Sequence, residues 1–327
     1  MSSLFSTYSV AVLLSALPPA PTANTDLALD LQGNLGVHTL QVGPGRVAHY
    51  QVVGTLSNAS SDGLAYFSTN LSFSGGALPQ ATNPTSGTMA SFAPPLGFSN
   101  PAGFGGTIVG GELVQVGGAQ NTIRNTIAAA PLGNVVLGVA QPSAPQVLVS
   151  GDLAAPYVVG TYSLAAHGSR ANVILPGQTG TPFYKVDKVG NTSSNALVVE
   201  VHAILARPGV VSVGVGQEQT LAIDAGPANA GRTYVCLGSL SGTTPGLMLP
   251  GGAILPVHPD GYTSFTVNHP NTAILQNSMG VLDANGRGRV VFHPDSRFVG
   301  KTVNHAFYLP STGLEFVSES EAVQVVQ

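Results

Sequence analysis

The sequence feature that most limits the fold is a series of short apolar runs, each ended by Gly, Pro, Asn or Ser. In LAYFSTNLSF (64–73) every second side chain can face a core, and LALDL (27–31) and VHTLQV (37–42) alternate in the same way. Alternation with a period of two is the pattern of a strand with one buried face. The pair Asn285-Gly286, between GVLDA and GRVVF, adds a tight-turn signal typical of a hairpin.

These runs predict an all-β chain of two antiparallel β-sandwich domains in tandem, of the jelly-roll or Ig-like kind. The 41 Gly and 24 Pro could also indicate disorder, but 43% of the residues are hydrophobic, which favours a folded core. A single helix is expected over 119–129, and YTSFTV (262–267) is expected to be a strand. Pro208-Gly209 marks the expected boundary. The predicted division is therefore an apolar N-terminal segment, a first sandwich and a second sandwich, over 1–25, 26–206 and 207–327.

The low content of charged residues limits the kinds of partner that this chain can be expected to bind. Only 8% of the residues are charged, against roughly 25% in ordinary soluble proteins. The net charge is −4, and the 11 Lys and Arg are scattered rather than clustered. Nucleic-acid binding needs a basic stripe to neutralise phosphates, so no nucleic-acid partner is expected. Cys236 is the single cysteine, which excludes an intrachain disulfide and predicts a buried, inert thiol.

The N-terminal 25 residues indicate export. VAVLLSAL (10–17) is followed by small residues and prolines, as in the apolar and cleavage regions of a signal peptide. No Lys or Arg precedes Arg46, so the usual basic start of such a peptide is missing, and an N-terminal strand kept in the fold is the alternative. A bilayer span takes about twenty apolar residues, so no membrane span is expected. The predicted location is secreted or at the cell surface.

No pattern of catalytic or metal-binding residues stands out. The eight histidines show no metal-ligand spacing, so no metal site is expected. Asp283 and Asn285 in LDANGRGR (282–289) superficially resemble a calcium loop that lacks its distal acidic ligand. GSLSG (238–242) has Leu240 where a serine-hydrolase elbow needs Ser. Glycoside hydrolysis needs a pair of catalytic carboxylates, and the sequence does not show which of the 15 Asp and Glu residues could form such a pair. The chain is therefore predicted to have no catalytic residues, to bind no cofactor and not to be an enzyme.

Candidate ligand contacts are aromatic. Residues 77–111 lack a strand pattern, and a loop of this length inside a domain is often functional. Its aromatic side chains could pin the loop by burial, or they could stack on a carbohydrate or peptide. The absence of Trp argues mildly against sugar stacking. The possible ligand or partner contacts are Phe92, Phe98, Phe104, Tyr50 and Tyr66.

Two family resemblances bear on function. The run GRTYVCLGSLSGTTPGLMLPGGAILPVHPDGYTSFTVNHPN, followed by GVLDANGRGRVVF and NHAFYL, resembles a C-terminal domain that recurs in exported proteins of planctomycetes and related bacteria. That resemblance covers about 207–327 and implies export without an assigned chemistry. VGPGRVAHYQVVGTLS, GLAYFSTNLSFSGG and GTYSLAAHGSRANVI, within about 26–206, resemble the cohesin-like β-sandwiches. Cohesins are non-catalytic modules that bind dockerins, and this chain shows no dockerin repeat.

Together these observations favour an exported, non-catalytic structural or adhesion protein of the bacterial cell surface. A charge-poor exterior and exposed strand edges would allow self-association, so the expected partner is a second copy of the chain or another surface protein. The C-terminal run SEAVQVVQ (320–327) is a candidate for edge pairing or strand donation. A carbohydrate- or peptide-binding module is the first alternative, with polysaccharide as a possible partner. An extracellular hydrolase with an unmarked site is the second alternative.

Overall fold

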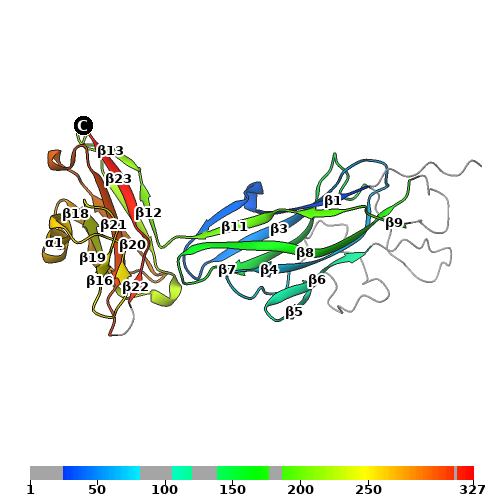
Figure 1. Ribbon diagram of the computed structural model, residues 1–327, viewed down its shortest axis with the longest axis horizontal. Coiled ribbons are helices and arrows are strands. Elements are labelled where there is room, and N and C mark those ends of the chain that lie inside the picture. The colour runs from blue at the N-terminus through cyan, green and yellow to red at the C-terminus, as the bar shows by residue number, and fades with distance from the viewer. Residues whose placement is uncertain (1–24, 82–104, 120–137, 177–185, 313–314) are drawn as a thin grey trace, which may run out of the picture.

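The computed structural model describes residues 25–81, 105–119, 138–176, 186–312 and 315–327. These residues form two β-sandwiches that lie end to end and give an elongated molecule (Figure 1). The predicted all-β class and tandem sandwiches are therefore confirmed. Three predictions lie outside the described residues: the N-terminal segment before Thr25, the helix over 119–129, of which only the first residue is described, and the loop aromatics Phe92, Phe98 and Phe104.

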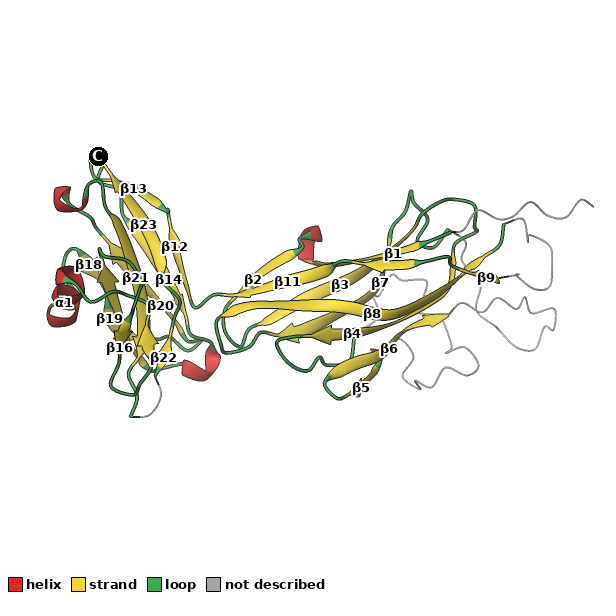
Figure 2. Ribbon diagram, viewed as in Figure 1, coloured by secondary structure: helices red, strands yellow, loops and turns green. Residues whose placement is uncertain are grey.

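The first sandwich consists of two facing sheets (Figure 2). One sheet has the strand order β10 (Thr192–Ser194), β1 (Leu27–Gly33), β3 (Val47–Leu56) and β7 (Gln146–Ala154). The other has the order β2 (Thr39–Val42), β11 (Ala196–Val201), β8 (Gly160–Ile174), β4 (Leu64–Phe73), β6 (Glu112–Ala119) and β5 (Thr107–Val109), with β9 (Val186–Lys188) also paired to β8. Most neighbours are antiparallel, and β1–β10 and β2–β11 are parallel.

The core of the first sandwich follows the alternation seen in the sequence. Leu27, Leu29 and Leu31 of β1 are buried while the residues between them are more exposed. Phe67 and Leu71 of β4 reach the same core from the opposite sheet. Each such side chain contributes about 1.5–3 kcal/mol when removed from water. Burial of alternate side chains is therefore what fixes which face of each strand points inward.

The second sandwich also has two main sheets. One has the order β12 (Ile204–Arg207), β14 (Gln219–Asp224), β20 (Arg287–Phe292) and β18 (Leu275–Gln276). The other has the order β13 (Val210–Ser212), β23 (Glu321–Val326), β21 (Thr302–Leu309), β15 (Thr233–Ser239) and β19 (Met279–Val281), with β22 (Phe316–Val317) on β21. A small hairpin is formed by β16 (Leu247–Met248) and β17 (Ile254–Leu255).

One segment expected to be a strand is a helix. Residues Gly261–Asn268 form α1, which covers the run predicted as a strand over 262–267. The Asp260 side chain accepts hydrogen bonds from the backbone N–H groups of Tyr262 and Thr263, as an N-cap does. Tyr262, Thr263 and Thr266 then share the buried face. The strand prediction was wrong because this cap and helical burial outweigh the β propensity of aromatic and β-branched residues.

The Asn285-Gly286 turn forms, but it does not join the two strands of a hairpin. Asp283 accepts hydrogen bonds from the N–H groups of Asn285 and Arg287 and so closes the turn. The strand before the turn, β19, pairs with β15, whereas β20 pairs with β14 and β18 in the facing sheet. The turn therefore carries the chain from one sheet to the other. The hairpin prediction was wrong because turn chemistry is local whereas sheet membership is decided by burial.

The structure corrects two further predictions about the second sandwich. Ile204–Arg207, which the sequence division left in the first sandwich, pairs with β14, so sheet membership changes at 202–203 rather than at Pro208-Gly209. The C-terminal run forms β23, which lies between β13 and β21 and is not an edge.

Cys236 is fully buried and free, and burial raises the pKa of its thiol to about 12. Among the described helices, none has the length and apolar character needed to cross a membrane.

Candidate functional site

The junction between the sandwiches is held directly by the chain itself. Strand β11 of the first sandwich ends at Val201 and β12 of the second begins at Ile204, so two residues connect them. The His202 N–H donates to the carbonyl of Val42 in the first sandwich. The Ala203 carbonyl accepts from the N–H of Asp224 in the second. Since each connecting residue is hydrogen-bonded to a different sandwich, the connection has little conformational freedom.

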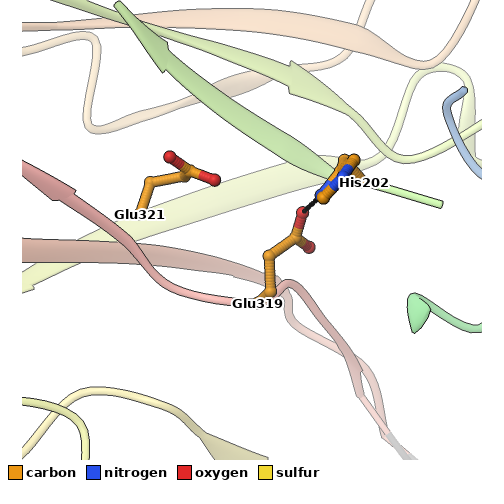
Figure 3. A group of neighbouring side chains, drawn as sticks. All are labelled: His202, Glu319 and Glu321. Atoms are coloured by element: carbon orange, nitrogen blue, oxygen red, sulfur yellow. Dashed lines mark hydrogen bonds and ion pairs between the residues drawn. The ribbon is translucent and has the colours of Figure 1, made fainter. Parts of the chain in front are cut away.

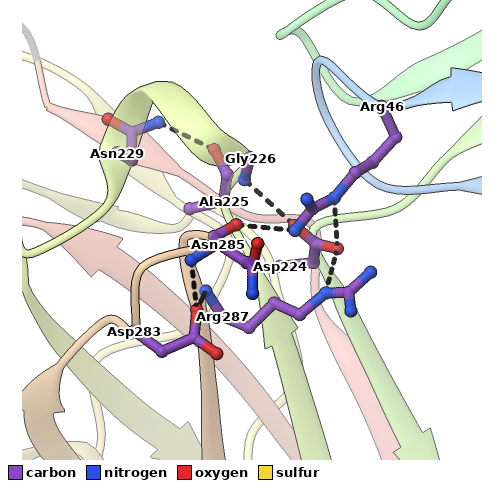
Figure 4. Close-up of polar contacts among 8 residues, drawn as sticks. All are labelled: Arg46, Asp224, Ala225, Gly226, Asn229, Asp283, Asn285 and Arg287. Atoms are coloured by element: carbon purple, nitrogen blue, oxygen red, sulfur yellow. Dashed lines mark hydrogen bonds and ion pairs between the residues drawn. The ribbon is translucent and has the colours of Figure 1, made fainter.

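An ion pair crosses the same junction. Arg46, in the turn between β2 and β3, donates from Nε and from a terminal guanidinium nitrogen to the two carboxylate oxygens of Asp224, at 3.0 and 2.8 Å (Figure 4). The same terminal nitrogen donates to the carbonyl of Asn285 at 2.7 Å. Asp224 also accepts from Arg287 and from the N–H of Gly226. Both Arg46 and Asp224 side chains are 20% exposed, so solvent screens this bidentate pair only in part.

Close backbone packing surrounds the ion pair. Gly226 has φ 82° and lies so near the Pro44 carbonyl that a Cβ atom would come within 2.3 Å of its oxygen. A Cβ on Gly43 would come within 2.6 Å of the Asp224 carboxyl group. Val159 of the first sandwich packs against the core of the second. The sequence gives no local signal for this interface, because Arg46 lies in a turn, Asp224 ends strand β14, and the two are 178 residues apart.

A histidine between carboxylates forms the second polar group at the junction. His202 Nδ1 lies 3.2 Å from Glu319 and its Nε2 lies 3.4 Å from Glu200 (Figure 3 shows the Glu319 contact). Possible ligand atoms of His202, Glu319 and Glu321 lie within 4.8 Å of one another. Burial raises the pKa of Glu321, the nearby Glu319 carboxylate raises it further, and His202 opposes the shift.

Glu319 of the second sandwich fixes the backbone of the connection where it enters β12. Both Glu319 oxygens accept hydrogen bonds from the N–H of Ala203, and one of them also accepts from the N–H of Ile204. Those backbone donors account for the position of the carboxylate without a metal ion. The cluster could not be found by spacing in the sequence, because Glu319 lies 117 residues from His202.

Of the candidate ligand contacts, Tyr50 and Tyr66 lie in the described chain, and the structure places them in different environments. Tyr50 is fully buried in the core of the first sandwich, so its ring is not available to a surface ligand. Burial raises the pKa of its hydroxyl, with a further contribution from Asp152. Tyr66 is partly exposed and lines a hollow on the same sandwich. The alternation that marked both residues as strand positions did not reveal which face each one occupies.

The Asp283 and Asn285 positions of the supposed calcium loop act as turn residues. Backbone donors at Arg287 and Asn285 lower the pKa of the Asp283 carboxyl group. The Asn285 carbonyl is used by Arg46 across the junction. These contacts give both residues structural roles.

Several sheet edges of the described chain carry exposed apolar side chains, and β5 and β19 carry two each. Strand β5 ends the larger sheet of the first sandwich, and its Ile108 and Val109 are 51% and 57% exposed. Strand β19 ends a sheet of the second sandwich, and its Met279 and Val281 are 41% and 66% exposed. Within the described residues neither strand has a second neighbour strand. β5 therefore leaves outward backbone groups available for pairing. On β19 the Asn271 side chain already bonds the N–H and carbonyl of Met279, so the outward groups of Val281 remain.

Comparison with known proteins gives distant structural likenesses. No known family model and no curated protein matches the sequence. Among solved structures, a chain of a type I cohesin–dockerin complex from Clostridium thermocellum is 8% identical, with 57% of this chain and 98% of that chain covered and a TM-score of 0.30. A C-terminal fragment of the major pilin of Streptococcus agalactiae is 10% identical, with coverages of 90% and 91% and a TM-score of 0.28.

The major pilin subunit BcpA of Bacillus cereus is likewise 10% identical, with coverages of 92% and 68% and a TM-score of 0.26. Scores this low do not establish a family or a shared activity. The likeness of 26–206 to cohesins is therefore limited to the β-sandwich architecture. The resemblance of 207–327 to a planctomycete export domain stays a prediction.

Proposed function

We propose that this chain is a non-catalytic structural or adhesion protein of the cell surface or extracellular space, which assembles with further copies through its strand edges. The observation that carries the proposal is that each sandwich has an edge strand with two exposed apolar side chains, β5 on one sandwich and β19 on the other. An edge from each sandwich allows head-to-tail contact between copies, and a repeated contact of that kind builds a chain of molecules.

The elongated shape supports the same role. The sandwiches lie end to end (Figure 1), and the Arg46–Asp224 pair and the short connection at His202 hold them in one arrangement. A body of this kind can span distance and transmit a load, as a surface fibre or adhesin must. The low content of charged residues reduces electrostatic repulsion between copies. The sequence prediction of export agrees with this location.

The test is the assembly state of the full chain in solution. Sedimentation velocity over a wide concentration range should show growing oligomers, and electron microscopy should show them as linear assemblies. The double variant Ile108→Lys/Val281→Lys places a charge on each edge, where a lysine discourages strand pairing, and should sediment as a monomer.

The control is Leu35→Lys/Val158→Lys. Leu35 and Val158 are 101% and 70% exposed and lie outside both edge strands, so this variant adds the same charge and removes more exposed apolar surface than the edge variant. It should assemble like the unmodified chain. A chain that stays monomeric at every concentration, or a control that dissociates as completely as the edge variant, would contradict assembly through these edges.

A further inference from the structure

A hollow of about 450 Å³ lies on the first sandwich. Strand β9, which supplies part of its lining, lies near the end of this sandwich that faces away from the second (Figure 1). The size of the hollow falls within the range of about 300–1,000 Å³ that is usual for small-molecule sites. Strands β4, β8 and β9 and the segment leading into β10 supply its lining, which includes Tyr66, Ser169, Arg170, Asn172, Lys188, Asn191 and Thr192.

Strand register brings the key side chains together. Tyr66 of β4 is paired with Asn172 of β8, and Asn172 is paired with Lys188 of β9. Residues directly opposite one another in a sheet point to the same face, and so do residues two apart on one strand. Arg170 therefore lies beside this row on the same outer face. The intervening Ala171 is buried on the core side.

Two cationic side chains without ion-pair partners in the described chain line the hollow. Arg46, Arg170 and Lys188 are the Arg and Lys residues in the described part of the first sandwich, and two of the three line this hollow. Neither Arg170 nor Lys188 forms an ion pair within the described part of the chain, although both are exposed. No Asp or Glu is among the described residues of the lining. Asp187 neighbours Lys188, but successive residues of a strand face opposite sides.

The neutral lining is polar and held in place. The Ser169 hydroxyl shares a 2.7 Å hydrogen bond with Thr69, and the Thr192 hydroxyl donates to the Ser169 carbonyl. The N–H and side-chain amide of Asn191 donate to Asp26. These bonds keep the wall of the hollow fixed before any ligand arrives, which lowers the entropic cost of binding.

We propose that this hollow binds an acidic saccharide unit of a polysaccharide, one that carries a carboxylate or sulfate group. Arg170 and Lys188 would hold the anionic group, because charge-assisted hydrogen bonds to carboxylate and sulfate oxygens are strong. The Asn172 amide suits the sugar hydroxyls, and the Tyr66 ring offers an apolar surface to a sugar face. An acidic peptide would satisfy the cations but would make less use of the Asn172 amide and the Tyr66 ring.

The proposal does not depend on self-association. The hollow uses the outer face of β8 and its neighbours, whereas assembly was assigned to the edges β5 and β19. A chain could fail to oligomerise and still bind polysaccharide, or assemble without binding it. The two proposals therefore fail independently.

The experiment measures binding of the full chain to polygalacturonate by affinity electrophoresis and calorimetry, with neutral dextran and poly-L-glutamate as comparison polymers. The unmodified chain should bind polygalacturonate, bind poly-L-glutamate at least about tenfold more weakly and not bind dextran. The variant Arg170→Gln/Lys188→Gln should weaken polygalacturonate binding at least about tenfold, since it removes both anion contacts. Tyr66→Ala should also weaken it.

The matched control is Arg207→Gln/Arg289→Gln, which removes the same charge from exposed positions of the second sandwich. It should bind polygalacturonate like the unmodified chain. Equal losses in both double variants would reduce the effect to net charge and overturn the proposal. So would equal binding of poly-L-glutamate, which would indicate a site for acidic peptides, or no binding of polygalacturonate at all. Equal unfolding midpoints of all variants would confirm that the exposed substitutions leave the fold intact.

Discussion

Removing the Arg46 side chain should loosen the junction between the sandwiches. Arg46→Ala deletes two hydrogen bonds to the Asp224 carboxylate and one to the Asn285 carbonyl, all of which cross from one sandwich to the other. The connection at His202-Ala203 and the packing of Val159 would remain. The variant should therefore fold normally but sample a wider range of angles between the sandwiches.

The size of the effect follows from the exposure and partners of the pair. Hydrogen bonds to charged groups contribute about 1.5–3 kcal/mol. Both side chains are 20% exposed, and Arg287 still neutralises Asp224 after the substitution, so the lower part of that range applies. A loss of about 2 kcal/mol changes the ratio of docked to undocked arrangements roughly 30-fold.

The assay is the distribution of distances between two spin labels, one on each sandwich. Asn34→Cys and Ser264→Cys provide exposed attachment points, while the buried native Cys236 should not be labelled. Arg46→Ala should broaden the distribution. Arg287→Ala is the matched control, because Arg287 also bonds Asp224 but belongs to the same sandwich as Asp224. An unchanged width in Arg46→Ala, or equal broadening in the control, would refute the role assigned to the ion pair.

Three further predictions concern the cores. Tyr50→Phe should be neutral or stabilising by up to about 2 kcal/mol in urea unfolding, because the buried Tyr50 hydroxyl has no hydrogen-bond partner among the described residues; a clear loss of stability would contradict this. Cys236 should react with a thiol reagent only as fast as the second sandwich opens, because its thiol is fully buried and burial raises its pKa to about 12; rapid reaction of the native chain would contradict its assigned place. Burial lowers the pKa of His305 from 6.5 to about 3, so the unfolded chain takes up a proton between these values while the folded chain does not. Stability of the second sandwich should therefore fall as pH drops below about 6.5, by about 2 kcal/mol between pH 7 and 5, and His305→Gln should remove this contribution in unfolding measured at both pH values.

Some local features of this protein were predictable because they depend on neighbouring residues. The alternation in 27–31 and 64–73 correctly indicated strands, and 27–31 buries one face as predicted, whereas Leu64 and Ser68 on the second face of 64–73 are also buried. The same approach failed over 262–267, where an Asp260 cap and the burial of one helical face produced α1. Aromatic and β-branched residues suit either structure, and the surrounding core decided between them.

The candidate sites were less predictable than the strands. Tyr50 and Tyr66 both occupy strand positions, yet one lies in the core and the other on the outer face. The cations of the hollow come from β8 and β9, and their proximity depends on strand register. Nothing in the local sequence specifies which strands will be neighbours.

The sequence by itself determined the all-β class, because side-chain alternation and Gly- and Pro-rich turns act over a few residues. Only the tertiary structure decided which strands share a sheet, which edges remain exposed, and where Arg46 meets Asp224, 178 residues away. The physical reason is that the burial of apolar faces is a property of the whole assembly of strands. Contacts between distant segments are settled when those faces pack together, and the junction, the edges and the hollow all depend on such contacts.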